Sequence, residues 1–119
     1  MISVPAHMPI YLYTQDTDMR KGAEGLSGIV RQHMQGDPLD GSLFLFINRR
    51  RDRMKMLHWD GGGYWVFYRV LEAGTFERLA SEQTSLQLDP TQLAMLLGGM
   101  QLASAARRKR HQQGSRKAG

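Results

Sequence analysis

Five basic side chains fall within seven residues near the middle of the chain. They lie in INRRRDRMKMLHWDGGGYW, residues 47–65, with a single acid, Asp52, among them. The five are Arg49, Arg50, Arg51, Arg53 and Lys55. Arginine guanidinium groups match phosphate oxygens in pairs, so a loop that presents several of them suits a nucleic-acid backbone. Solvation at a hairpin tip also accommodates charge, but it explains less well why nearly all of these charges share one sign. On charge alone both interpretations stay open.

Two further groups of basic residues suit the same chemistry. In DMRKG, residues 18–22, Arg20 and Lys21 stand at the expected start of a helix, where backbone N–H groups favour an anion. Capping alone already accounts for Asp18. The C-terminal stretch RRKRHQQGSRK either binds phosphates as a flexible arm through counterion release or serves only as a solubilising end. Its first four bases are Arg107, Arg108, Lys109 and Arg110.

Aromatic residues flank the central basic cluster, and exposed rings there would stack on bases. Alternating aromatic residues in a strand more often face a core, so packing is the simpler interpretation. The residues concerned are Trp59, Tyr64, Trp65, Phe67 and Tyr68.

The sequence has no convincing pattern for catalysis or metal binding. Its acids are scattered mostly over expected turns and do not form the converging carboxylates of a two-metal nuclease. The four histidines, His7, His33, His58 and His111, lack metal-ligand spacing, and there is no cysteine. We therefore predict no catalytic residue, no metal and no cofactor, and hence a protein that is not an enzyme.

The charge of the chain is unevenly distributed. Its 119 residues hold sixteen Lys and Arg against eleven Asp and Glu, a formal net charge of +5. Six of the bases fall in the last thirteen residues, so residues 1–106 are nearly neutral overall. Separate basic clusters on an otherwise acidic body are compatible with polyanion partners. The lack of cysteine, of a signal-peptide pattern and of a bilayer-spanning apolar run favours a cytoplasmic protein with no membrane partner.

A small α+β domain is expected to position these residues. Apolar residues at three- and four-residue steps predict a helix near 18–35, capped by Thr17 or Asp18. The stretch from Asp89 to Gln92 predicts the start of a second helix near 90–99. Strands are expected at 9–14, 42–48, 53–59, 64–71, 74–79 and 84–89.

Short connections between the strands favour an antiparallel β-meander of about four to six strands, with DGGG at 60–63 as one turn. The strands at 42–48 and 64–71 are apolar on both faces, which predicts central positions in the sheet. Met54 and Met56 are expected to pack in the core. We predict one α+β domain over residues 1–102 and a flexible basic tail over residues 103–119.

The order of the motifs resembles one known family. IYLYTQDTDMRKGAEGLSGIV, FINRRRDRMKMLHWDGGG and PTQLAMLL follow one another as in the short accessory protein encoded beside the transposase in the sixty-six group of bacterial insertion sequences. That family is called TnpB or the second open reading frame product, and it differs from the RNA-guided nuclease of the same name. The resemblance runs from about Pro9 to Met100. Its characteristic residues fall on Asp18, Met19, Arg20, Lys21, Gly22, Arg50, Asp52, Arg53, Lys55, Trp59, Asp60 and Gly61.

The resemblance implies a non-catalytic role in transposition, and none of these residues receives a catalytic role from it. His58 departs from the aliphatic or aromatic residue expected at its position. Our first hypothesis is that the basic hairpin, assisted by the tail, contacts DNA phosphates at the ends of the insertion sequence. The alternative is an adaptor that docks the transposase or another accessory protein of the same element without binding DNA. An exposed sheet edge giving a homodimer is a third possibility.

Overall fold

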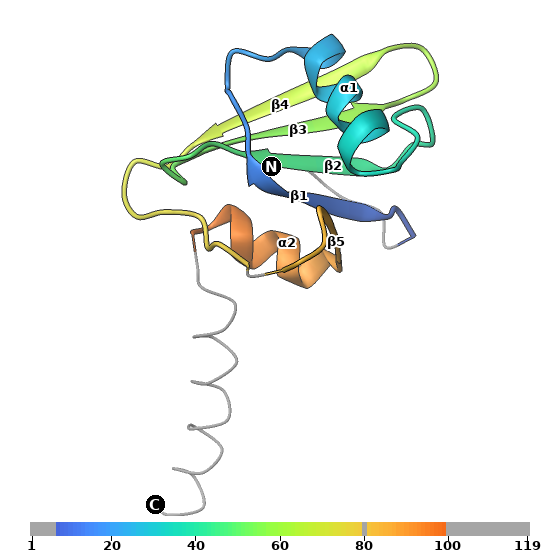
Figure 1. The fold of residues 1–119 in the computed structure, drawn as a ribbon. Helices are drawn as coiled ribbons and strands as arrows, with labels where there is room; N and C mark the ends of the chain where they lie inside the picture. Colours follow the sequence, from blue (N-terminus) through green and yellow to red (C-terminus); the bar gives the residue numbers. More distant parts are fainter. Residues whose placement is uncertain (1–6, 80, 100–119) are drawn as a thin grey trace, which may run out of the picture.

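The computed structural model describes residues 7–79 and 81–99. These residues form five strands and two helices in the order β1 (Ile10–Asp16), α1 (Ala23–His33), β2 (Leu43–Ile47), β3 (Arg53–Trp59), β4 (Tyr64–Val70), β5 (Ser85–Leu88) and α2 (Pro90–Leu97). The strands form one sheet in the order β4-β3-β2-β1-β5. Figure 1 shows α1 on one face of this sheet and α2 on the other. The predicted α+β class with two main helices is confirmed.

The sheet is mixed rather than wholly antiparallel. β2, β3 and β4 form the expected antiparallel meander, and β5 also pairs antiparallel with β1. β1 and β2, however, are parallel neighbours. Parallel neighbours need a long crossover, and the segment between Asp16 and Leu43 supplies one because it contains α1. As a result the C-terminal ends of β1 and β2 lie side by side, at the same end of the strands.

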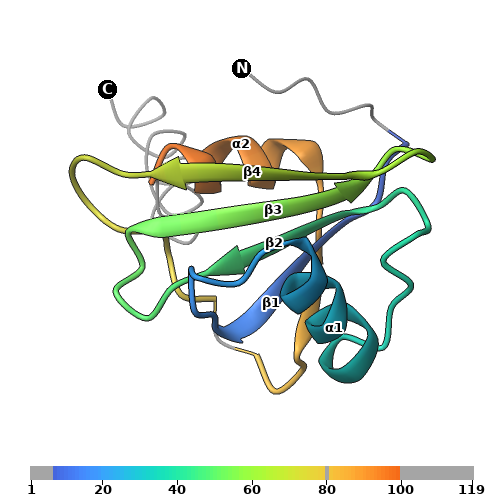
Figure 2. The same cartoon turned by 90° about the horizontal axis from the view of Figure 1, so that it is seen from above.

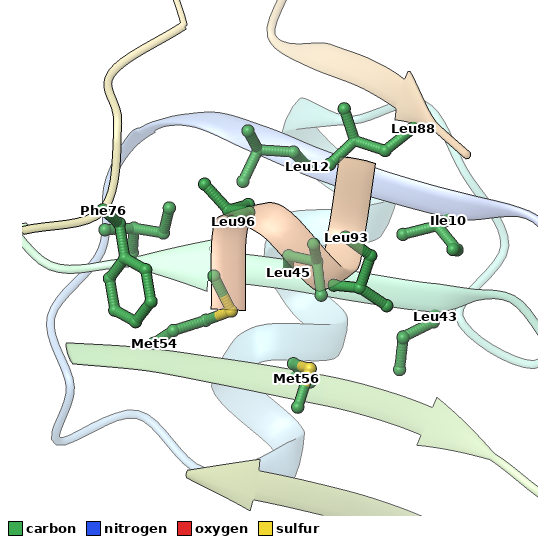
Figure 3. Packing of buried hydrophobic residues seen from close by; sticks show 11 residues of the cluster. Ile10, Leu12, Leu43, Leu45, Met54, Met56, Phe76, Leu88, Leu93 and Leu96 are labelled. Carbon is green, nitrogen blue, oxygen red and sulfur yellow. The ribbon is translucent and has the colours of Figure 1, made fainter. Parts of the chain in front are cut away.

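The sheet separates two apolar cores. Every residue of β2 is buried, and its side chains alternate between the two faces. Phe44 and Phe46 pack on the α1 side with Leu26 and Val30 of that helix. On the α2 side, Leu43, Leu45 and Ile47 join a larger cluster that includes Leu93 and Leu96, as Figure 3 shows for most of its members. The predicted central position of β2 is confirmed.

The buried methionines also behave as the sequence predicted. Met54 and Met56 are buried on the α2 face of the sheet (Figure 3). Lys55 lies between them on the strand and faces the other side. Two methionines and the lysine between them therefore follow the alternation of a strand.

The predicted central position of β4 is wrong. β4 is an edge strand of the described sheet with β3 as its neighbour there, and Trp65, Tyr68 and Val70 are 55%, 50% and 47% exposed. An apolar pattern on both faces also fits an edge strand with exposed aromatic side chains, and periodicity does not separate the two cases.

The strand predicted at residues 74–79 is absent. These residues lie within the connection from β4 to β5, where Gly74 has a φ of +76° that a strand does not allow. Phe76 is nevertheless 1% exposed, because its ring fills the α2-side core. The apolar residues that suggested a strand serve as an anchor for a loop.

The observed helix boundaries differ most from the predicted ones at the start of α1. The helix begins at Ala23, and Gly22 is its N-cap without any side-chain cap, so the prediction of Thr17 or Asp18 as cap is wrong. Residues 18–22 instead form the connection from β1. At the second helix, the carboxylate of Asp89 accepts from the backbone N–H of Gln92, whose side chain in turn accepts from the backbone of Asp89. This capping box confirms the predicted start.

The DGGG turn between β3 and β4 is confirmed. Asp60 accepts hydrogen bonds from the backbone N–H groups of Gly62 and Gly63 and from the indole N–H of Trp65. These bonds, the one from Gly62 first, lower the pKa of the Asp60 carboxyl. Gly61 has a φ of +98°, a conformation that residues with a Cβ rarely adopt.

No helix within residues 7–79 and 81–99 is long and apolar enough to cross a membrane. The predicted tail over 103–119, the domain boundary at residue 102 and the basic residues Arg107, Arg108, Lys109 and Arg110 lie outside the described residues.

Candidate nucleic-acid interface

Two basic motifs that are separated in the sequence lie close together at the C-terminal ends of β1 and β2. Because β1 and β2 are parallel, the β1–α1 connection and the β2–β3 turn lie at the same end, as Figure 2 shows. Between them is an open cleft of about 370 Å³. The residues lining it are Thr17, Asp18, Met19, Asn48, Arg49, Arg50 and Arg53. The crossover through α1 therefore brings TDM and NRRRDR together.

The β2–β3 turn is held by one asparagine side chain. Asn48 Oδ1 accepts from the backbone N–H groups of Asp52 and Arg53, each at 3.0 Å. Its Nδ2 donates to the Asp52 carboxylate at 2.7 Å. Asp52 is thus bound by an amide and forms no ion pair with a basic residue of the described chain. The turn is fixed from within, and its exposed arginines are not needed to hold it.

Arg51 has a different role from its neighbours. Its φ of +65° turns the backbone at the tip, and its guanidinium donates to the backbone carbonyls of Phe76 and Glu77. The Phe76 N–H donates back to the Arg51 carbonyl. Burial, as the largest cause, lowers the pKa of Arg51. Arg51 therefore fastens the β4–β5 connection to the turn and does not line the cleft.

Arg49, Arg50 and Arg53 are the exposed cations of the cleft. None of the three forms an ion pair within the described part of the chain. Arg53 donates to the Tyr68 hydroxyl at 3.3 Å, which leaves other N–H groups of its guanidinium available. Three guanidinium groups around one cleft make an electropositive surface suited to an anion.

Asp18 is the acid among the residues that line the cleft, and it is already paired. Arg20 donates to both of its carboxylate oxygens, with a shortest distance of 2.7 Å. The hydrogen bond from the Arg20 side chain is the main reason why the pKa of Asp18 falls to about 2. The same pairing raises the pKa of Arg20. The carboxylate is ionised at neutral pH, and Arg20 compensates its charge.

Lys55 and Tyr68 lie beside the cleft on the α1 side of the sheet. Lys55 Nζ donates to the backbone carbonyl of Lys21 at 2.9 Å and lies 5.4 Å from the centre of the Tyr68 ring. These contacts connect β3, β4 and the β1–α1 connection. Lys21 has an exposed side chain at the same place. Tyr68 is half exposed, so its ring is accessible next to this basic surface.

The structure thus gathers most of the predicted site residues. Arg49, Arg50 and Arg53 line the cleft, and their neighbours Arg20, Lys21 and Lys55 lie around it, whereas Arg51 points into the β4–β5 connection. Sequence reasoning did not assign Thr17 or Asn48 to the site. An asparagine directly before a basic run is a turn signal, so Asn48 was detectable. Nothing near Thr17 in the sequence indicates that it lies in a cleft.

The described residues contain no group of three or more His, Asp or Glu side chains placed to hold a metal ion. Trp65 stacks on Phe67, and Trp59 packs edge-on against Tyr64. The packing interpretation therefore fits Phe67 and Tyr64, which pack against the two cores, whereas Trp65 stays exposed. Tyr68 is the aromatic residue whose ring lies beside the basic cleft.

Comparison with known proteins gives consistent matches. The family described as "IS66 Orf2 like protein" matches residues 8–107. A protein of Sinorhizobium fredii named "Uncharacterized protein y4jC" is 31% identical over 100 residues, which cover 84% of this chain and 86% of that protein. "Uncharacterized protein y4hO" of the same organism is 32% identical over 100 residues, with 84% and 87% covered. No solved structure matches.

Proposed function

Because this chain belongs to the IS66 Orf2-like family of insertion-sequence accessory proteins, we propose that it assists transposition by binding DNA through its basic cleft. It performs no catalysis itself and acts in the cytoplasm together with the transposase of the same element. Its ligand is the phosphate backbone at the ends of the insertion sequence.

One observation supports DNA binding above all: Arg49, Arg50 and Arg53 surround a single cleft without an acidic partner among the described residues. Exposed arginines that only solubilise a turn need no common cleft and no rigid frame. Here Asn48 fixes the turn, and Arg51 fastens it to the neighbouring connection. A fixed loop loses little conformational entropy when it binds, so this arrangement favours contact with a regular phosphate backbone.

The test is binding of the full-length protein to labelled duplex DNA across a series of salt concentrations. We expect the logarithm of the association constant to fall linearly with the logarithm of the salt concentration. Changing Arg49, Arg50 and Arg53 together to Ala should reduce the steepness of this line by up to about 2.7, since each lost phosphate contact removes about 0.9. Arg31→Ala, on the exposed side of α1, is the single-charge control.

A slope for the triple variant that matches the wild-type slope would contradict binding through the cleft. Absence of any duplex binding at low salt would contradict DNA binding altogether. In that case the basic residues around the cleft would need another acidic partner.

A second candidate function is docking of the transposase on the edge of the sheet. Within the part of the chain that the structure describes, β4 pairs only with β3, and it exposes Trp65, Tyr68 and Val70. An unpaired edge with exposed apolar side chains suits the addition of a strand from a partner, whether the transposase, the other accessory protein of the element or a second copy of this chain.

This second function is tested with Trp65→Gln. Trp65 lies near the start of β4 and donates to Asp60 in the β3–β4 turn, whereas Arg53 of the cleft is paired with Val70 at the other end of β4. The change leaves the net charge unaltered. Docking on β4 predicts that the variant loses copurification with the transposase while duplex binding stays at the wild-type level. Unchanged copurification would exclude Trp65 from the docking surface.

A further inference from the structure

A buried hydroxyl group on a residue that lines the cleft has no partner in the described chain. Thr17 lines the cleft directly after β1, and its side chain and backbone together are only 4% exposed. Its backbone N–H donates to the Ile47 carbonyl at 2.9 Å, which fixes the residue against the end of β2. Its Oγ1 is buried and makes no hydrogen bond with a described residue.

This is an unusual state for a side chain that has both a donor and an acceptor. A buried hydroxyl without a hydrogen bond loses its interactions with water and gains nothing in return. The nearest acid in the sequence, Asp18, does not relieve it, because its carboxylate accepts from Arg20 and makes no hydrogen bond with Thr17 Oγ1. A valine would fill the same space without this cost. The hydroxyl is therefore expected to serve a molecule that enters the cleft.

The charges around Thr17 indicate the chemistry of that molecule. Three guanidinium groups line the same cleft, and the one carboxylate there is compensated. A cleft of about 370 Å³ is at the lower end of the range for small-molecule pockets, about 300–1,000 Å³. An anion that accepts several hydrogen bonds at once satisfies both the arginines and the hydroxyl, and phosphate oxygens do so in pairs with arginine.

We propose that the cleft is a binding site for one phosphate group. In this site Thr17 Oγ1 donates to a phosphate oxygen while Arg49, Arg50 and Arg53 neutralise the charge of the phosphate. This assignment rests on the proposed function in one respect: there the phosphate belongs to the DNA backbone. A free phosphate offers the same chemistry, and the experiment separates the two sources.

The first part of the experiment compares Thr17→Val with Thr17→Ser in duplex binding. Valine keeps the shape and removes the hydroxyl, whereas serine keeps the hydroxyl. We expect T17V to weaken duplex binding about three- to tenfold and T17S to bind within about twofold of the wild type. Because the hydroxyl is uncharged, the loss in T17V should be the same at every salt concentration, unlike the loss in the triple arginine variant.

Thermal unfolding separates this role from a structural one. The hydroxyl has no hydrogen-bond partner among residues 7–79 and 81–99, so T17V should unfold at the same temperature as the wild type or at a higher one. A binding loss that accompanied a fall in melting temperature of the free protein in T17V, without recovery in T17S, would overturn the assignment.

The second part uses inorganic phosphate with the wild-type protein and follows backbone amides by NMR. We expect saturable shifts at Thr17, Asp18 and the 48–50 turn, absent with equal concentrations of chloride and weakened in T17V. If the protein binds the duplex but shows neither these shifts nor an effect of T17V, the proposed phosphate-binding site is contradicted and DNA binding still stands. If phosphate shifts the amide signals only when Thr17 is present and the protein does not bind the duplex, the cleft is a binding site for free phosphate. That result would contradict the proposed function.

Discussion

At the level of single residues, the Asp18–Arg20 pair controls how much positive charge the cleft presents. While Asp18 is ionised it occupies the guanidinium of Arg20, whose side chain is 91% exposed and follows directly after Met19, a residue that lines the cleft. Asp18→Asn should tighten duplex binding about two- to fivefold and make its salt dependence steeper by up to about 0.9, since Arg20 becomes free to contact a phosphate. Salt titrations of the two proteins measure both quantities. A weaker affinity in the variant would contradict this role.

The same pair gives a pH dependence of known sign. The pKa of Asp18 lies at about 2, below its ordinary value of 3.8. A lowered pKa in the folded protein means that the stabilisation is complete above about pH 4 and is lost as the pH falls through 2. Thermal unfolding from pH 5 to pH 2 should therefore show a larger loss of stability in the wild type than in Asp18→Asn. Parallel curves would contradict the pairing seen here.

The sequence predicted the roles of some single residues and not of others. The difference lies in the partner that each side chain contacts in the fold. Arg49 and Arg51 look equivalent in NRRRDR, yet the first lines the cleft and the second binds the carbonyls of Phe76 and Glu77. Residue type and spacing indicated the chemistry of the cluster. They carried no information about a loop that returns from 25 residues further along the chain.

At the level of elements, α2 offers a test that should leave the cleft untouched. Its capping box joins Asp89 to Gln92, and its Leu93 and Leu96 are buried on the face of the sheet opposite α1. Asp89→Ala should lower the free energy of unfolding by about 1 kcal/mol, within a usual range of about 0.5–2, because the first turn loses its cap. Urea denaturation measures this, with the exposed Thr91→Ala as control.

The stability change in Asp89→Ala should not alter DNA affinity, because α2 packs on the far face of the sheet from α1 (Figure 1). A reduced affinity at temperatures where the variant is fully folded would mean that α2 contributes to the interface.

Elements whose signals were local were predictable, and those defined by distant partners were not. The capping box and the DGGG turn follow from residues within four positions of one another, and both are present. The position of β4 and the state of residues 74–79 depend on what packs against them. β4 has an apolar pattern but pairs on one side only, and Phe76 is anchored in the core without a strand around it. Hydrophobicity indicates burial more directly than it indicates pairing.

At the level of the whole molecule, the topology creates the site. If β1 and β2 were antiparallel, as in a simple meander, the β1–α1 connection would lie far from the β2–β3 turn, because antiparallel neighbours end at opposite ends of the strands. The α1 crossover makes β1 and β2 parallel and places TDM beside NRRRDR. The two motifs were visible in the sequence as separate basic candidates. Their meeting in one cleft was not, because it follows from a parallel pairing that local connections did not indicate.

The charge distribution of the whole chain gives the last prediction, which concerns the rate of binding. Residues 1–106 are nearly neutral, and six bases follow in the last thirteen residues. A chain ending at Met100 should bind the duplex about tenfold more slowly at low salt, because a basic segment raises the rate of encounter with DNA. The difference should shrink as salt rises and screens the charges. Stopped-flow measurements across a salt series give these rates.

A full-length variant with Arg107, Arg108, Lys109 and Arg110 changed to Gln is the matched control, since it removes charge and keeps length. If charge is the cause, it should reproduce most of the loss in association rate seen in the shortened chain. Thr17→Val placed in the shortened chain should still weaken binding by the same factor as in the full chain, because the cleft and the basic segment act on different steps. An association rate unaffected by the shortening would assign the whole electrostatic attraction to the cleft.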